Sequence, residues 1–155
     1  LLLTIALLDG GSADDAVEQV LRVLELVPDR IEARHLLLRA SLRAKQHEEA
    51  LEDAAYLLAL DAGDAEALVA RTVALLSLNR PDEAGPALAE FGAAVADLPD
   101  DAKWQPRLCA ATAAFAKEKG DRGAAEALWN ECLEQSPGDA LLVFGAIEFF
   151  DERPG

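Results

Sequence analysis

The stretch EEALEDAAYLLALDAGDAEAL, Glu48–Leu68, is a run of helix-favouring residues, rich in Ala and Leu, that is interrupted by a short break. A similar pattern occurs at Asp14–Arg34, DDAVEQVLRVLELVPDRIEAR, and at Gly123–Val143, GAAEALWNECLEQSPGDALLV. Few individual residues are identical among the three stretches. A pattern that recurs with different residues indicates one structural unit built several times, in which only size and polarity at the contact positions are constrained.

The breaks between these runs recur regularly. Pro28, Ala62 and Ala96 are evenly spaced along the chain. The next equivalent position, Pro137, comes later than even spacing predicts, by about two helical turns. Each interval reads as a helix, a short turn, a second helix and a break.

Two further features recur with the same spacing. Turn-forming residues precede the second helices at Asp9–Ser12, Lys45–His47, Asn79–Glu83 and Lys119–Gly123. A small residue then recurs early in each second helix, where two helices must approach closely: Ala16, Ala50, Ala84 and Ala125.

This repeat resembles the tetratricopeptide repeat (TPR), a unit of about 34 residues that forms an antiparallel pair of helices. The resemblance rests on Ala50, Leu57, Leu60 and Asp61 in one unit, on Ala16, Val23, Leu26 and Pro28 in the unit before it, and on Gly120, Asp121, Ala125, Cys132 and Pro137 in a later one. It implies an all-α fold, a right-handed α-solenoid of about eight helices. Arg34 and Arg71 depart from the family's pattern by replacing apolar side chains; we expect both to pack their stems and pair with acids. Trp104 and Trp129 are expected in the core.

The repeats predict a single domain over residues 1–155. It consists of a half unit at 1–30, units at 31–64, 65–101 and 102–139, and a lone first helix at 140–153. Because one helix pair cannot bury its apolar face alone, each unit covers the face of its neighbour. An array that begins and ends within a unit leaves apolar faces uncovered, so we expect the chain to be an excerpt of a longer protein.

The long interval between Ala96 and Pro137 marks an irregular junction. The additional residues lie around Phe91–Leu108 and are expected to lengthen the second helix of one unit, the first helix of the next, or both. Leu98–Asp101 is the expected break, with Asp101 capping a helix that begins at Ala102. Pro86 should bend or delay the helix that contains it. We favour a local change in superhelical pitch at this junction over a hinge.

The composition excludes two classes of partner. The chain has 155 residues and a formal net charge of −15, so its surface repels nucleic acids and anionic membranes. Apolar residues make up 52% of the sequence, but the opening run LLLTIALL is too short to cross a bilayer and no longer run follows. We therefore expect neither nucleic-acid binding nor membrane insertion.

Side chains that perform catalysis or bind metals are not grouped in the sequence. His35 and His47 have no second ligand at helical spacing, and no Gly-rich phosphate loop follows a strand. Cys109 and Cys132 are too few for a disulfide scaffold, and we favour two buried thiols over a disulfide or redox pair. The sequence thus predicts no enzyme, no cofactor and no metal site.

The resemblance implies that first helices line a concave groove in which peptide segments of other proteins dock. The residues predicted to line it are His35, Leu36, Arg39, Leu42, Arg43, Val69, Val73, Leu76, Ala110, Ala114 and Phe144. Because His35, Arg39 and Arg43 are four positions apart, they share one helix face and predict a basic site for an acidic group, beside an apolar floor for Leu-like side chains. The alternative is that acidic residues of the flanking helices neutralise these cations: Asp14, Asp15, Glu18, Glu48, Glu49, Glu52 and Asp53.

The sequence therefore predicts a protein-interaction scaffold that binds a peptide or a partner protein in the groove. Two alternatives stay open: a regulatory or substrate-docking segment of a larger enzyme or of a secretion or assembly machine, and a module that associates with copies of itself. A cytoplasmic location is favoured over a periplasmic or envelope-associated one. The sequence does not identify the partner.

Overall fold

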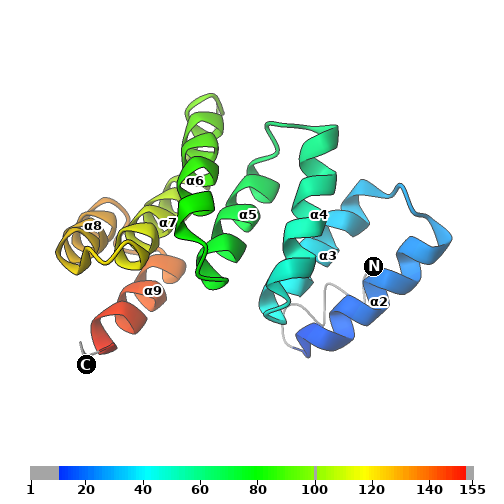
Figure 1. The fold of residues 1–155 in the computed structure, drawn as a ribbon, viewed down its shortest axis with the longest axis horizontal. Coiled ribbons are helices and arrows are strands. Elements are labelled where there is room, and N and C mark those ends of the chain that lie inside the picture. The colour runs from blue at the N-terminus through cyan, green and yellow to red at the C-terminus, as the bar shows by residue number, and fades with distance from the viewer. Residues whose placement is uncertain (1–10, 100, 153–155) are drawn as a thin grey trace.

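The computed structural model of the chain describes residues 11–99 and 101–152. Within these ranges the chain forms eight helices and no strand (Figure 1). The helices are α2 Ala13–Leu26, α3 Ile31–Arg43, α4 His47–Leu60, α5 Ala65–Ser77, α6 Pro81–Ala96, α7 Gln105–Glu118, α8 Arg122–Gln135 and α9 Ala140–Asp151. The all-α prediction is confirmed over this part of the chain. The first ten residues of the half unit expected at 1–30 lie outside the described residues.

The helices pair with their neighbours in sequence, and the pairs stack into one extended array (Figure 1). α3 packs on α4, α5 on α6 and α7 on α8. The first helices of successive pairs also contact one another, α3 with α5, α5 with α7 and α7 with α9. They thus form a continuous row through the array, with α9 as its last member. This row supplies the candidate site.

The turn between the two helices of each pair repeats the same backbone geometry. One residue in each turn has a left-handed backbone: Lys45 (φ 59°), Asn79 (φ 55°) and Gly120 (φ 84°). Lys45 and Asn79 are one repeat apart, and Gly120 follows after the longer interval found in the sequence. The residue after each one donates its backbone N–H to the carbonyl five positions earlier, Gln46 to Ser41, Arg80 to Leu75 and Asp121 to Ala116, at 2.8–3.0 Å. This is the Schellman arrangement, which satisfies carbonyls left free at a helix end.

The close approach of helices predicted at four alanines is confirmed. Ala16, Ala50, Ala84 and Ala125 are each 0% exposed. Ser12 caps α2, because its side chain accepts a hydrogen bond from Asp15 N at 3.3 Å. Asp64, Asp121 and Asp139 cap α5, α8 and α9 in the same way. Such caps satisfy backbone N–H groups that the first helical turn leaves unpaired.

The additional residues of the junction lie mainly in the connection between α6 and α7. α6 has 16 residues, against 14 in the second helices α4 and α8, and α7 has 14, against 13 in the first helices α3 and α5. The predicted helix start at Ala102 under an Asp101 cap is wrong, since α7 begins at Gln105. The reason is Pro106: in a helix begun at Ala102 it would lie where its ring and missing N–H disrupt the helix, whereas the first turn tolerates it. The carbonyl of Asp101 accepts instead from Trp104 N and Gln105 N, at 2.8 and 2.9 Å.

α6 begins at Pro81 and continues through Pro86, so Pro86 does not delay the helix.

A small apolar cluster joins α5, α6 and this connection. Phe91, 0% exposed, packs in the cluster. Trp104 is half-buried against it, with its ring edge-on to Phe91 and the two ring centroids 6.3 Å apart. Trp104 thus packs at the margin of the core and is only partly buried, whereas it was expected within the core.

Candidate functional site

A groove opens between the first helices α5, α7 and α9, with a volume of about 620 Å³. Six residues that the sequence predicted in a groove meet here: Val69, Val73, Leu76, Ala110, Ala114 and Phe144. Ser77, Arg107, Ala111, Trp129, Leu141, Gly145 and Glu148 complete its lining. Most of these residues are apolar, and charged side chains are confined to Arg107 and Glu148.

Each wall of the groove is one face of a helix. Val69 and Val73 are four positions apart on α5, and Ala110 and Ala114 are four apart on α7, so each pair lies on one face. The short alanine side chains of α7 leave open a volume that larger residues would fill. Phe144 of α9 lies at the rim and is 69% exposed. An open apolar floor beside an exposed phenylalanine is the kind of surface that marks an interaction site.

The base of the groove includes Trp129, which comes from a second helix, α8. Its side chain is 6% exposed, so the expected core position is confirmed. It reaches the groove because α9 has no side chain at Gly145: a Cβ atom there would lie 2.7 Å from Cη2 of the indole. Sequence reasoning missed this contribution to the groove. The available signal was a glycine in the middle of an otherwise apolar helix, which often marks a close approach.

Cys109 of α7 and Cys132 of α8 form a disulfide, with their Cα atoms 5.8 Å apart. The expectation of two free buried thiols is therefore wrong. The two residues face each other across the antiparallel helix pair at a separation that suits a disulfide. Cys132 lies in the same buried cluster as Trp129 and Phe149. The bond thus ties the helix that carries the alanine floor to the helix that carries Trp129.

The predicted basic face on α3 is largely neutralised, and it lies outside the groove. His35 Nε2 lies 2.6 Å from Asp64 Oδ2. Arg39 binds Glu66 through two of its nitrogens, and this hydrogen bonding raises the pKa of Arg39. The acids that pair with these cations belong to the beginning of α5 and not to the flanking second helices. Arg43 is exposed and forms no ion pair with the residues described here.

Two leucines predicted in the groove have other positions. Leu36 is buried in a cluster that α3 forms with α2. Leu42 packs against the cluster between α3, α4 and α5. Both lie on α3, whose apolar side chains pack against α2, α4 and α5. The described groove therefore begins at α5.

The two arginines that depart from the family's pattern are paired, as expected. Arg34 Nη1 lies 3.4 Å from Asp53 Oδ1, and its guanidinium lies over the ring of Tyr56 at 4.3 Å. Arg71 pairs with Glu90. Burial raises the pKa of Asp53 to about 6, and Arg34 only partly offsets this rise.

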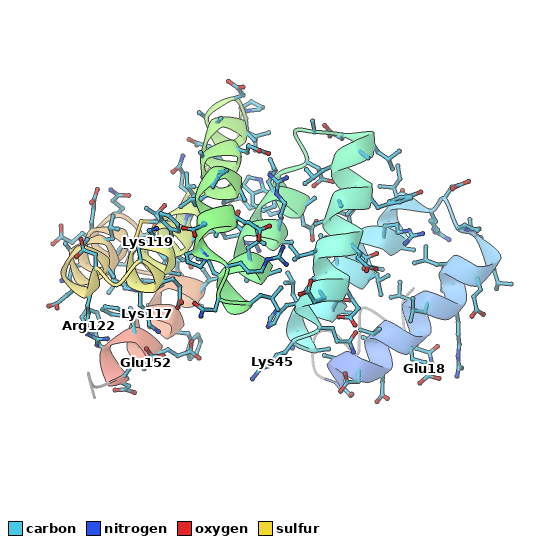
Figure 2. The ribbon with its side chains drawn as sticks, in the orientation of Figure 1. Glu18, Lys45, Lys117, Lys119, Arg122 and Glu152 are labelled. Carbon is cyan, nitrogen blue, oxygen red and sulfur yellow. A yellow bond between two sulfur atoms is a disulfide. The ribbon has the colours of Figure 1, made fainter. Side chains whose placement is uncertain are left out.

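The end of α9 is held to α7 and α8 by polar contacts. Lys117 forms an ion pair with Glu152, which lowers the pKa of that carboxyl group. Arg122 donates to the backbone carbonyls of Phe149 and Glu152 at 3.1 and 2.6 Å. Figure 2 shows Lys117, Arg122 and Glu152 gathered at this end of the array. These contacts fix the helix that forms the far wall of the groove.

Over residues 11–99 and 101–152, no group of three or more His, Cys, Asp or Glu side chains is placed to hold a metal ion. In the same part of the chain, no helix has the length and apolar character needed to span a bilayer.

The stacked antiparallel pairs, the repeated turn and the regular period define a helical-repeat fold of the TPR type. The structure is similar to the crystal structure of TTC0263, a thermophilic TPR protein of Thermus thermophilus. The similarity has a TM-score of 0.53, covers 97% of this chain and 96% of that chain, and comes with 21% sequence identity. At this identity the likeness establishes the fold alone. No model of a known family and no curated protein matches the chain.

Proposed function

We propose that this chain is a binding scaffold whose groove between α5, α7 and α9 receives an apolar segment of a partner protein. The groove itself is the observation that carries the proposal: about 620 Å³ of mainly apolar space, with Trp129 at its base and the exposed Phe144 at its rim. A volume of this size accommodates a small ligand or a few peptide side chains. Aromatic residues are enriched among the anchors that contribute most to protein interfaces.

The support beneath the groove favours binding without large rearrangement. The disulfide between α7 and α8 and the contacts of Arg122 with the end of α9 hold two of its walls. A site that is already in its binding conformation loses less conformational entropy when the ligand arrives. The walls therefore need little ordering on binding.

The proposed ligand differs in chemistry from the one that the α3 cations suggested. Asp64 and Glu66 already engage His35 and Arg39, so these cations are poorly placed to anchor a carboxylate. In the proposal the affinity comes from apolar contacts instead. We expect a dissociation constant of about 1–100 μM for a short peptide, because few of its side chains enter the groove.

Isothermal titration calorimetry with blocked peptides rich in Leu and Phe tests the proposal. Phe144→Asp places a charge at the rim of the groove and should weaken binding by about tenfold or more. Leu60→Asp is the matched control, because Leu60 is also an exposed apolar residue, 59% exposed, but lies at the end of α4 outside the groove. Equal affinities for the two variants, both with intact far-UV circular dichroism, would contradict the proposal.

A second candidate function, self-association through α9, is favoured by one observation. Leu141, Phe144, Ile147 and Phe150 of this helix are all exposed. Light scattering over a range of concentrations distinguishes the two functions. A monomer at every concentration supports the binding scaffold. A dimer that Phe144→Asp dissociates would instead support self-association through α9.

A further inference from the structure

We infer that the groove selects a segment whose apolar side chains are flanked by an acidic residue on one side and a basic residue on the other. The inference rests on the proposed function and specifies the chemistry of the bound segment. Arg107 and Glu148 are the charged members of the groove lining, and they have opposite signs. Between them the lining is almost wholly apolar.

The two charges lie at opposite ends of the groove. Arg107 is in the first turn of α7, and Glu148 is in the last turn of α9. The helices α5, α7 and α9 are the first helices of successive pairs and cross the long axis of the array in the same general direction (Figure 1). The beginning of α7 and the end of α9 therefore face the two different mouths of the groove.

Both charges are available to a ligand. Neither Arg107 nor Glu148 forms a salt bridge within residues 11–99 and 101–152. The guanidinium of Arg107 lies over the ring of Trp104 at 5.0 Å, which holds it beside the groove. By contrast, Arg39 of α3 and Lys117 of α7 are each paired with a glutamate. The groove therefore keeps one cation and one anion for a bound segment.

The separation of the charges sets their spacing in the ligand. The groove lining runs from Arg107 to Ala114 on α7 and from Leu141 to Glu148 on α9. Each interval is seven helical positions and covers about 10 Å along the helix axis. Neighbouring helices lie about 8–10 Å apart. The diagonal from the cation to the anion is then about 14 Å, which an extended peptide covers in about four residues. The acidic and basic residues of the segment should be about four positions apart.

Binding of blocked pentapeptides with one shared apolar core tests the inference, with Trp fluorescence as the signal. The neutral reference is Gln-Leu-Leu-Phe-Gln, and the charged peptides carry Glu and Lys at the two ends in both orders, two Glu, or two Lys. At least one of the Glu and Lys peptides should bind more tightly than the reference, by roughly two- to fivefold for each charge engaged.

Variants of the protein identify which end each charge meets. Arg107→Gln should remove the gain from Glu, and Glu148→Gln should remove the gain from Lys. Exchanging the two charges, Arg107→Glu with Glu148→Arg, should make the peptide with Glu and Lys ends in the opposite order the tighter ligand. Arg43→Gln is the matched control, because Arg43 is an exposed cation of α3 outside the groove; it should leave all affinities within about twofold.

The outcomes separate the inference from the proposed function. Absence of binding by the neutral peptide would refute the proposed function and the inference with it. Binding of the neutral peptide with no gain from any pair of charges would overturn the inference alone. A preference for two Lys that Arg107→Gln leaves unchanged would also overturn it, because the net charge of −15 would then set the preference.

Discussion

Replacing Gly145 by alanine tests whether the contact between α9 and Trp129 holds the far wall of the groove in place. A Cβ atom at this position would lie 2.7 Å from Cη2 of the indole and 3.3 Å from Cζ3. The indole is 6% exposed and packs against Phe149, so it has little room to move. The added methyl group should cost about 1–3 kcal/mol by overpacking. The better helix propensity of alanine offsets only about 0.5–1 kcal/mol of this, so the free energy of unfolding should fall by about 0–2.5 kcal/mol.

Gly92→Ala is the matched control for this substitution. Gly92 lies inside α6, and a Cβ atom there would meet Leu108 Cδ1 at 3.8 Å, an ordinary contact. Without a clash, the change to alanine should stabilise the protein by about 0.5–1 kcal/mol. Urea unfolding followed by far-UV circular dichroism gives both free energies. If Gly145→Ala stabilises the protein as much as Gly92→Ala, the indole is not held against α9 and the reasoning about the base of the groove is refuted.

The disulfide and the buried carboxylate provide further tests. Cys109 and Cys132 are separated by 23 positions, so replacing both by alanine should lower the free energy of unfolding by about 3 kcal/mol. A reducing agent should destabilise the native chain in urea unfolding but not the double variant; no effect on the native chain would show that the bond is absent. The pKa of Asp53 is raised from 3.8 to about 6 in the folded state, so between these values the folded state binds more protons than the unfolded state. Its contribution to stability is thus present at low pH and is lost as pH rises from about 4 through about 6, by up to about 3 kcal/mol. Asp53→Asn should remove this part of the pH dependence in urea unfolding, and an unchanged slope would contradict the role assigned to its burial.

The repeated helix pair was predictable because its pattern recurs at a regular spacing in the sequence. The left-handed turn residues Lys45, Asn79 and Gly120 recur at the intervals first seen in the sequence. Helical spacing within one unit also identified which side chains share a face, and six of the predicted groove residues consequently meet in the structure. Such inferences use neighbours within a helix or equivalent positions in successive helices, which sequence spacing determines directly.

The incorrect predictions concern the helix start after the junction and contacts between distant residues. Pro106 overrode the expected cap at Asp101, since its missing N–H confines it to a first turn. His35 pairs with Asp64, 29 positions away, across two first helices, whereas the sequence suggested acids on the flanking second helices. The cysteine pairing likewise depends on how α7 lies against α8. Two isolated cysteines in a sequence are compatible both with buried thiols and with a disulfide until the separation of their Cα atoms is known.

Nuclear magnetic resonance of the side-chain methyl groups, recorded during titration with a blocked peptide rich in Leu and Phe, tests the central claim most directly. The claim predicts that the methyl signals of Val73, Ala110 and Ala114 shift together and saturate with one affinity, because these groups line the groove. Those of Val17 and Leu37, buried between α2 and α3, should stay unchanged. Shifts centred on α2 and α3, or saturable binding without any shift in the groove, would contradict it.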